Sequence, residues 1–304
     1  MNTNRVQPHS VAVIGAGNMG GAMVARLLSL GHRVAVCDID PARQREAAAL
    51  GARVAASPAG AAALLATDGL LIVCVVDATQ TEAVLFGDEG AVAVLVPGQD
   101  VMLCPTIAPE DVERLSARLS GAGLACIDAP MSGGPARARE GQMSLMLAAP
   151  AEVLERRREL LGQLSSRCFE LGDRPGDGAR TKLVNNLLAG INLVGAAEAV
   201  ALAERLGLDA GRTLDVIEQS SGQSWIGLDR MRRAINGDLA PRAHVTLLEK
   251  DTRLAIEAAA RAGFQGPLGA HAARVFAQAH EAGLADLDDA ALLPFLRQRG
   301  KAGG

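Results

Sequence analysis

One lysine in a mostly apolar stretch could carry acid–base chemistry. Residues 176–186 read GDGARTKLVNN, and Lys182 and Asn186 stand one helical turn apart, so they share a face of the predicted helix. Oxidising an alcohol requires a group that takes the hydroxyl proton while hydride leaves the carbon. A lysine can do this when desolvation and a nearby positive charge lower its pKa from about 10.4. The alternative is a lysine that snorkels to the surface. Because the chain contains no Tyr, Lys182 is the best candidate.

A second segment, DAPMSGG at residues 128–134, follows a short apolar run. Open α/β sheets place their ligands beyond the carboxyl ends of their strands, and this segment would lie there. The Ser132 hydroxyl and the bare backbone N–H groups of Gly133 and Gly134 could together bind a substrate carboxylate. The alternative is an ordinary turn built from proline and glycine.

A glycine fingerprint near the start of the chain predicts a dinucleotide site. GAGNMG at residues 15–20 follows the apolar run SVAVI and opens a helical pattern, which is the strand–turn–helix context that suits a pyrophosphate. The first glycine permits the tight turn, the second admits the phosphates, and the third lets helix and strand pack closely. The predicted cofactor-binding residues here are Gly15, Ala16, Gly17, Asn18, Met19 and Gly20.

Asp38 ends the second apolar run, about twenty residues beyond the fingerprint, where a carboxylate would bond the adenosine ribose hydroxyls. Its charge repels a 2′-phosphate and no arginine follows it directly, so the sequence favours NAD over NADP. The alternative is that the glycines only form a tight turn and that Asp38 only caps a loop. A methyltransferase also binds a nucleotide on such a sheet, although the three-glycine spacing suits a pyrophosphate better.

The composition narrows the classes of protein. The chain has 304 residues, a net charge of −4 and 49% hydrophobic residues, which excludes disorder and predicts two domains. An acidic balance and 2% aromatics argue against nucleic acid as a partner. Five scattered cysteines predict a reducing compartment and neither a disulfide framework nor a metal site. The start, MNTNRVQPHS, lacks the apolar region of a signal peptide, and polar residues interrupt the most apolar helix. We therefore expect a cytoplasmic protein without a membrane partner.

Alternating apolar runs and helical patterns must position these residues. Through the first half of the chain they predict a parallel sheet with helices on both faces. Two further strands, around a helix at 151–164, would lie at the sheet edge. The predicted strands are residues 11–14, 33–37, 70–76, 101–104 and 124–128, with 143–148 and 168–171 as the added pair.

Beyond the turn-rich GDRPGDG the pattern is helical throughout. The fold class is therefore an α/β domain with a mostly parallel sheet, residues 1–173, followed by an all-α domain, residues 174–304. The polar end, RQRGKAGG, is expected to fray. The predicted helices are residues 179–206, 209–219, 225–235, 245–262, 268–282 and 289–298, with Gly207, Gly237, Gly263 and Gly283 at helix ends.

The first of these helices is apolar nearly all round and needs more cover than one small bundle supplies. We therefore expect a second subunit to cover it, in a homodimer or homotetramer.

Together, GAGNMG, DAPMSGG and the G-x-G-x-x-x-K-x-x-N-N pattern resemble the β-hydroxyacid dehydrogenase family, in the right order along nearly the whole chain. Ala138, Gly141 and the Lys250-Asp251 pair also match the family. VVDATQTEAVLFG and residues 224–238 resemble its threonate dehydrogenase branch. The resemblance implies a Rossmann domain that binds NAD, a helical domain that holds a dimer together, and an active site between the two.

By this resemblance, Lys182 is the catalytic lysine, Asn186 orients the substrate, and Ser132, Gly133 and Gly134 bind the substrate carboxylate.

The resemblance also places Thr106 beside the nicotinamide and Lys250 over the cofactor. The sequence departs from the family pattern at three places. Cys104-Pro105-Thr106 replaces the usual Ser-Thr run, Met131 replaces the common Val, and Asp177 replaces a small residue and brings a carboxylate near Lys182.

The sequence thus predicts NAD-dependent oxidation of a small hydroxy acid that is threonate-like or 3-hydroxyisobutyrate-like. The alternatives are a reductase of an oxo acid, semialdehyde or imine, and a catalytically silent dinucleotide-binding relative.

Overall fold

The computed structural model describes residues 8–299. Residues 1–7, part of the stretch expected to lack a signal peptide, and residues 300–304, part of the end expected to fray, lie outside the described residues. The chain forms two compact units, which divide between Lys182 and Leu183. The predicted domain boundary after residue 173 lies a short way upstream and stays a prediction.

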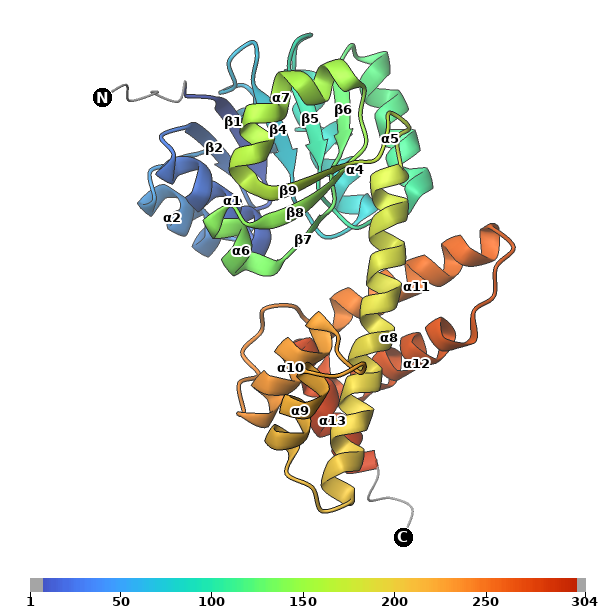
Figure 1. Cartoon of the computed structure of the whole chain (residues 1–304). Helices are drawn as coiled ribbons and strands as arrows, with labels where there is room; N and C mark the ends of the chain where they lie inside the picture. The colour runs from blue at the N-terminus through green and yellow to red at the C-terminus, as the bar shows by residue number, and fades with distance from the viewer. Residues whose placement is uncertain (1–7, 300–304) are drawn as a thin grey trace. The chain divides into compact units, whose positions relative to one another are not determined.

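The first unit is built on a six-stranded parallel sheet with the strand order β3-β2-β1-β4-β5-β6 (Figure 1). This is the order of the doubly wound dinucleotide-binding fold. The predicted α/β Rossmann class is therefore confirmed, and the short strand β3 is an addition to the predicted set. The strands are β1 (Ser10–Ile14), β2 (Arg33–Cys37), β3 (Arg53–Val54), β4 (Leu70–Val73), β5 (Asp100–Leu103) and β6 (Ala125–Asp128).

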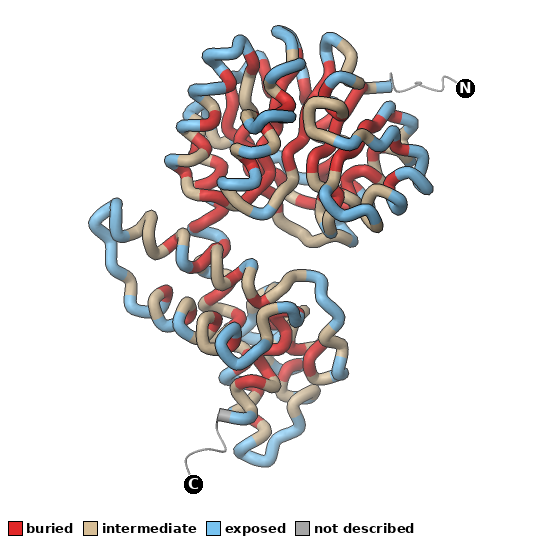
Figure 2. Tube along the Cα trace, turned by 180° about the vertical axis from the view of Figure 1, so that it is seen from behind, coloured by how far each residue is buried: buried red, intermediate tan, exposed pale blue. Residues whose placement is uncertain are grey.

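Helices cover both faces of this sheet, because each strand sends alternate side chains into two apolar cores. In β4, Leu70 and Ile72 join the core shared with α1 and α7, whereas Leu71 and Val73 join the core shared with α4 and α5. Figure 2 shows the buried residues following the central strands. The helices of this unit before α8 are α1 (Asn18–Ser29), α2 (Pro41–Ala49), α3 (Pro58–Ala62), α4 (Ala78–Phe86), η1 (Ala91–Ala93), α5 (Pro109–Gly121), α6 (Gly134–Glu140) and α7 (Ala151–Leu164).

A second sheet of three strands, in the order β7-β8-β9, corrects one prediction. Its strands are β7 (Met131–Ser132), β8 (Met143–Leu147) and β9 (Ser165–Glu170). The segments 143–148 and 168–171 do form strands, and Ala148 bridges to Asp128 of the edge strand β6, but the two strands belong to a separate sheet and do not continue the large one as predicted. Instead, β8 pairs antiparallel with β7 and parallel with β9. The reason is that β7, too short to show a sequence pattern, supplies the pairing edge that β8 uses.

The second unit is helical, as predicted, and no strand follows β9 in the described residues. Gly207, Gly237 and Gly263 have φ of 76°, 75° and 72°, the left-handed conformation that ends a helix. The remaining elements are α8 (Asp177–Arg205), which begins in the first unit, α9 (Ala210–Glu218), α10 (Trp225–Ile235), α11 (Val245–Arg261), α12 (Pro267–Ala279), η2 (His280–Leu284), η3 (Asp289–Ala291) and α13 (Leu292–Arg299).

Helix α8 is the one helix in the described part of the chain that could cross a membrane by length and composition, and 33% of its most apolar stretch is buried. Its side chains Leu193, Ala197 and Val200 belong to the core of the helical unit, as expected of a central helix in a bundle. The absence of a membrane partner stays a prediction. Three large apolar side chains of α8 are exposed, Val184, Leu188 and Leu202, and so is Leu206 just after the helix.

Candidate active site

Parallel strands bring the predicted site segments of the first unit to one edge of the sheet. The glycine fingerprint follows β1, Asp38 follows β2, Thr106 lies just beyond β5, and DAPMSGG spans the end of β6. Cys74 follows β4 at the same edge, but burial raises the pKa of its thiol to about 12, so it stays protonated at neutral pH. The nucleophile or base of this edge must therefore be sought elsewhere.

Two of the three fingerprint glycines occupy positions where a side chain would clash with the backbone. Gly15 has φ of 92°, and a Cβ there would lie 2.6 Å from the Cys74 carbonyl oxygen. A Cβ at Gly20 would lie 1.9 Å from the Gly15 carbonyl oxygen. A Cβ at Gly17, by contrast, would meet nothing within 4 Å. The backbone is therefore tightly packed at the two outer glycines and open to a ligand at the middle one.

The Asp38 carboxylate is fastened to this turn. Its Oδ2 accepts the Ala16 N–H at 2.5 Å, and its Oδ1 accepts the Asp40 N–H at 2.8 Å. Each carboxylate oxygen keeps a further lone pair for a ligand donor. Asp38 thus stands beside the glycine turn in the place that the sequence predicts.

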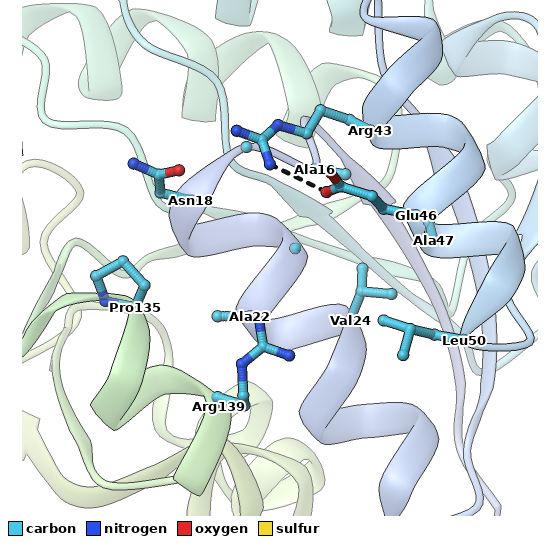
Figure 3. A pocket seen from close by; sticks show the side chains of 12 residues that line it. Ala16, Asn18, Ala22, Val24, Arg43, Glu46, Ala47, Leu50, Pro135 and Arg139 are labelled. Atoms are coloured by element: carbon cyan, nitrogen blue, oxygen red, sulfur yellow. Dashed lines mark hydrogen bonds and ion pairs between the residues drawn. The ribbon is translucent and has the colours of Figure 1, made fainter. Parts of the chain in front are cut away.

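A cavity of about 160 Å³ adjoins the turn and reveals two arginines that the sequence analysis missed. Arg43 of α2 and Arg139 of α6 line it, and Arg43 pairs with Glu46 at 3.0 Å (Figure 3). Arg43 could have been suspected from its place shortly after Asp38. Arg139 could not, because only the packing of α6 on α1 brings it there. The other lining residues are Ala16, Gly17, Asn18, Gly21, Ala22, Val24, Ala47, Leu50 and Pro135.

The predicted carboxylate cradle is a bend between β7 and α6. Ser132 ends β7 and is half-buried, and Gly133 and Gly134 have φ of 132° and 76°. These are backbone conformations that glycine adopts without strain. A Cβ at Gly134 would meet nothing within 4 Å, so the backbone is open there, whereas a Cβ at Gly133 would lie 3.2 Å from the Arg137 side chain.

Lys182 is buried, with 8% of its surface exposed, and the surface alternative is therefore wrong. A buried ammonium group is costly, and such lysines are common where a functional site uses them. At the start of α8, about one turn before Lys182, the Gly176 and Ala179 N–H groups donate to the Asp128 side-chain carboxylate. Lys182 accordingly belongs to the same unit as Ser132, Gly133 and the glycine turn.

The second unit holds Asn186, also buried, in a chain of polar contacts. Its Nδ2 donates to Asp251 Oδ2 at 2.6 Å, and Asp251 Oδ1 accepts from Lys250 Nζ at 2.8 Å. Asn185 Nδ2 donates to Asn186 Oδ1 at 3.0 Å. Asp251, which the sequence analysis noted only as part of a motif, therefore joins the two predicted site residues of this unit.

The extra carboxylate of Asp177 has a cation of its own. Arg180 donates to Asp177 at 2.8 Å and to Glu113 of α5 at 2.5 Å. The Arg180 hydrogen bond lowers the pKa of Glu113, which stays ionised. The Asp177 charge is thus compensated by Arg180, which weakens the expected influence on Lys182.

Comparison with known families identifies the class. Residues 10–172 match the family described as the NAD binding domain of 6-phosphogluconate dehydrogenase. Residues 176–296 match the family described as NAD-binding of NADP-dependent 3-hydroxyisobutyrate dehydrogenase. The chain belongs to the β-hydroxyacid dehydrogenase family, and it is an NAD(P)-dependent oxidoreductase that acts on CH–OH groups.

Individual relatives agree with this assignment. The chain is 38% identical to an L-threonate dehydrogenase of Cupriavidus necator, over 96% of this chain and 99% of that protein. It is 36% identical to a 3-hydroxyisobutyrate dehydrogenase of Pseudomonas aeruginosa, over 88% and 90%. A crystal structure of 3-hydroxyisobutyrate dehydrogenase from Salmonella typhimurium matches with a TM-score of 0.87 and 33% identity, covering 95% of this chain and 100% of that one. The predicted resemblance, including the threonate branch, is confirmed.

Proposed function

We propose that this enzyme oxidises a small hydroxy acid with NAD and that Lys182 takes the hydroxyl proton. The observation that carries the proposal is the burial of Lys182 on a helix whose first turn is bonded to the DAPMSGG segment. The names of the relatives above support threonate and 3-hydroxyisobutyrate as substrate candidates.

The glycine turn fits a dinucleotide. The open backbone at Gly17 and the free N–H groups at the start of α1 suit a pyrophosphate, and the residues of 15–20 would hold it. Asp38 would bond the adenosine ribose and disfavour a 2′-phosphate, which supports NAD over NADP. Thr106 and Lys250 are proposed as further cofactor contacts. When bound, NAD supplies the hydride acceptor.

The remaining groups would act on the substrate. Ser132 and the N–H groups of Gly133 and Gly134 bind the carboxylate, and Asn186 orients the hydroxyl. The neutral Lys182 amine takes the O–H proton while the carbinol C–H bond breaks and its electron pair leaves as hydride. The carbinol carbon becomes a carbonyl. This mechanism needs the proton acceptor to lie at a fixed distance from the groups that bind the substrate carboxylate.

Replacing Lys182 tests the proton transfer. We expect Lys182→Ala to lower kcat by about 10²–10⁴-fold, the usual contribution of a general base, while NADH still binds. Lys182→Arg should be nearly as inactive, because a guanidinium keeps the positive charge but does not give up its proton. A loss below tenfold in Lys182→Ala, or near-normal turnover in Lys182→Arg, would contradict the assignment. Glu198→Gln, at an exposed position of the same helix, is the control.

A panel of hydroxy acids tests the substrate class. L- and D-threonate, glycerate, 3-hydroxyisobutyrate and 3-hydroxypropionate are each offered with NAD or NADP, and reduced cofactor is measured. Turnover of at least one of them with NAD is expected. Failure of every acid with both cofactors would contradict the proposed class.

The exposed apolar side chains of α8 support the proposal of a homo-oligomer. Sedimentation at micromolar concentration should show a dimer or tetramer, and a monomer would contradict this. The five free cysteines support a reducing compartment, the cytoplasm.

A further inference from the structure

Asp128 is a buried carboxylate that contacts two segments of the proposed site. It ends β6, is 2% exposed, and pairs with Leu103 of β5 in the sheet register. Its backbone also exchanges two hydrogen bonds with Ala148, at 3.0 and 2.9 Å. The position of its Cα is therefore fixed from both sides.

The Asp128 side chain holds the start of α8. Its Oδ2 accepts the Gly176 N–H at 3.0 Å and the Ala179 N–H at 3.1 Å. A Cβ at Gly178 would lie 2.9 Å from Asp128 Oδ1 and 2.8 Å from the Met146 carbonyl oxygen. The carboxylate thus satisfies N–H groups that a helix start leaves without partners, and glycine at 178 allows its close approach.

These contacts join two parts of the proposed chemistry. Gly178 and Ala179 lie one helical turn before Lys182, and Ser132 follows Asp128 after a short bend. Asp128 therefore begins the segment that contains the proposed carboxylate cradle. Its side chain also accepts hydrogen bonds from the helical turn that precedes Lys182. All of these residues lie in the first unit.

We propose that Asp128 is a positioning residue, which fixes Lys182 relative to the carboxylate cradle formed by Ser132, Gly133 and Gly134. This inference rests on the proposed function. A shift of about 1 Å between reacting groups can cost about 10²-fold in rate, so a rigid link between the cradle and the lysine has a direct use.

An ionised carboxylate does this better than an amide. Both of its oxygens accept hydrogen bonds, and a helix start favours negative charge. In Asp128→Asn, one acceptor becomes an NH₂ group that faces backbone N–H donors. The variant keeps the size of the side chain and loses some of the hydrogen bonds to the backbone N–H groups of the Gly176–Ala179 turn.

The hydrogen bonds between the Asp128 carboxylate and the start of α8 also depend on pH. Burial raises the pKa of the Asp128 carboxyl to about 6, although the N–H groups of Ala179, Gly176 and Gly178 act to lower it. The other titratable groups that face it are Asp177 of α8 and the thiols of Cys104 and Cys126. Burial raises the pKa of both thiols far above neutrality, so Asp128 is the group of this cluster that titrates near pH 6.

The test compares Asp128→Asn with Glu113→Gln in the full-length enzyme. Glu113 holds the same helical turn through Arg180, but it is 40% exposed. At pH 8 we expect Asp128→Asn to lower kcat by about 10- to 100-fold, with NADH affinity within twofold of wild type. Glu113→Gln should change kcat by less than threefold.

The pH profile separates positioning from simple structural support. As pH falls from 8 to 5, wild-type Asp128 becomes protonated and loses an acceptor, whereas the amide does not change. The ratio of variant to wild-type kcat should therefore rise toward one. A flat ratio would overturn the proposal.

Two other results would also overturn it. One is a kcat of Asp128→Asn within threefold of wild type, and the other is an equal loss in Glu113→Gln. If Asp128→Asn does not fold, Gly178→Ala takes its place, because its methyl group pushes against the intact carboxylate. That variant should lose at least tenfold in kcat, and normal turnover would overturn the proposal.

The Lys182 variants separate this inference from the proposed function. An inactive Lys182→Ala with a normal Asp128→Asn overturns only the role of Asp128. An active Lys182→Ala overturns the proposed proton transfer itself.

Discussion

The buried Asp128 carboxyl should make the stability of this protein depend on pH in an unusual direction. Burial raises its pKa from 3.8 to about 6, a rise of about 2 units. At about 1.36 kcal/mol per unit, the linked free energy is ~3 kcal/mol. Because the folded-state pKa lies above the unfolded value, this contribution is fully present below pH 3.8 and is lost as pH rises through about 6.

The Asp128→Asn variant removes this titration. Its stability relative to wild type should therefore improve by up to about 3 kcal/mol between pH 4 and pH 8, whatever the absolute difference at any one pH. The measurement is urea and thermal unfolding of both proteins at several pH values. A relative stability that stays constant, or that falls as pH rises, would refute the reasoning.

Glu113→Gln provides a control of opposite sign. Its hydrogen bond from Arg180 lowers the pKa of Glu113, so its contribution is present above the unfolded pKa and is lost as pH falls. The free energy of unfolding of this variant should fall relative to that of wild type as pH rises. The change should be small because the Glu113–Arg180 pair is partly exposed to solvent. A carboxylate that costs stability at neutral pH while serving turnover is the pattern expected of a functional residue.

Three further predictions concern other parts of the chain. Arg230→Ala should destabilise the helical unit by about 3–5 kcal/mol in urea unfolding, because it leaves the buried carboxylate of Asp289 without its cation. Arg232→Ala, at an exposed position of the same helix, should cost about 1 kcal/mol or less. Asp38→Asn should lower the ratio of kcat/KM for NAD to that for NADP by at least about tenfold, since it removes the charge that opposes a 2′-phosphate, and an unchanged ratio would disprove that role. Gly162→Ala, on the exposed side of the last turn of α7, should stabilise the protein by about 0.5–1 kcal/mol, because the added Cβ meets nothing within 4 Å outside the backbone of its own helix. A lowered melting temperature would contradict this.

Local patterns were sufficient for most of the fold. The strand predicted at residues 70–76, in a sheet with helices on both faces, is β4, which has Leu70 and Ile72 in one core and Leu71 and Val73 in the other. The helix predicted at 225–235 is α10. Such elements are readable because burial imposes a period on the sequence. The two-residue strands β3 and β7 are too short to show a period.

Strand pairing was beyond the reach of the sequence. Residues 143–148 look like an edge strand of the large sheet, yet β8 pairs with β7 and β9 in a sheet of its own. Pairing depends on which backbone edges lie free nearby, and side-chain patterns carry little information about that.

The sequence by itself determined the chemical inventory of this enzyme: three fingerprint glycines after a strand, a serine before two glycines, a lysine and an asparagine one turn apart, and no tyrosine. Those assignments follow from residue type and local spacing, which are properties of the chain. Tertiary structure decided which groups are buried and which are brought together. It buried Lys182, carried Arg139 to the cavity beside the glycine turn, and bonded Asp128 to the start of α8. Burial and contacts between distant segments are fixed when whole layers pack, so no local stretch of sequence contains them.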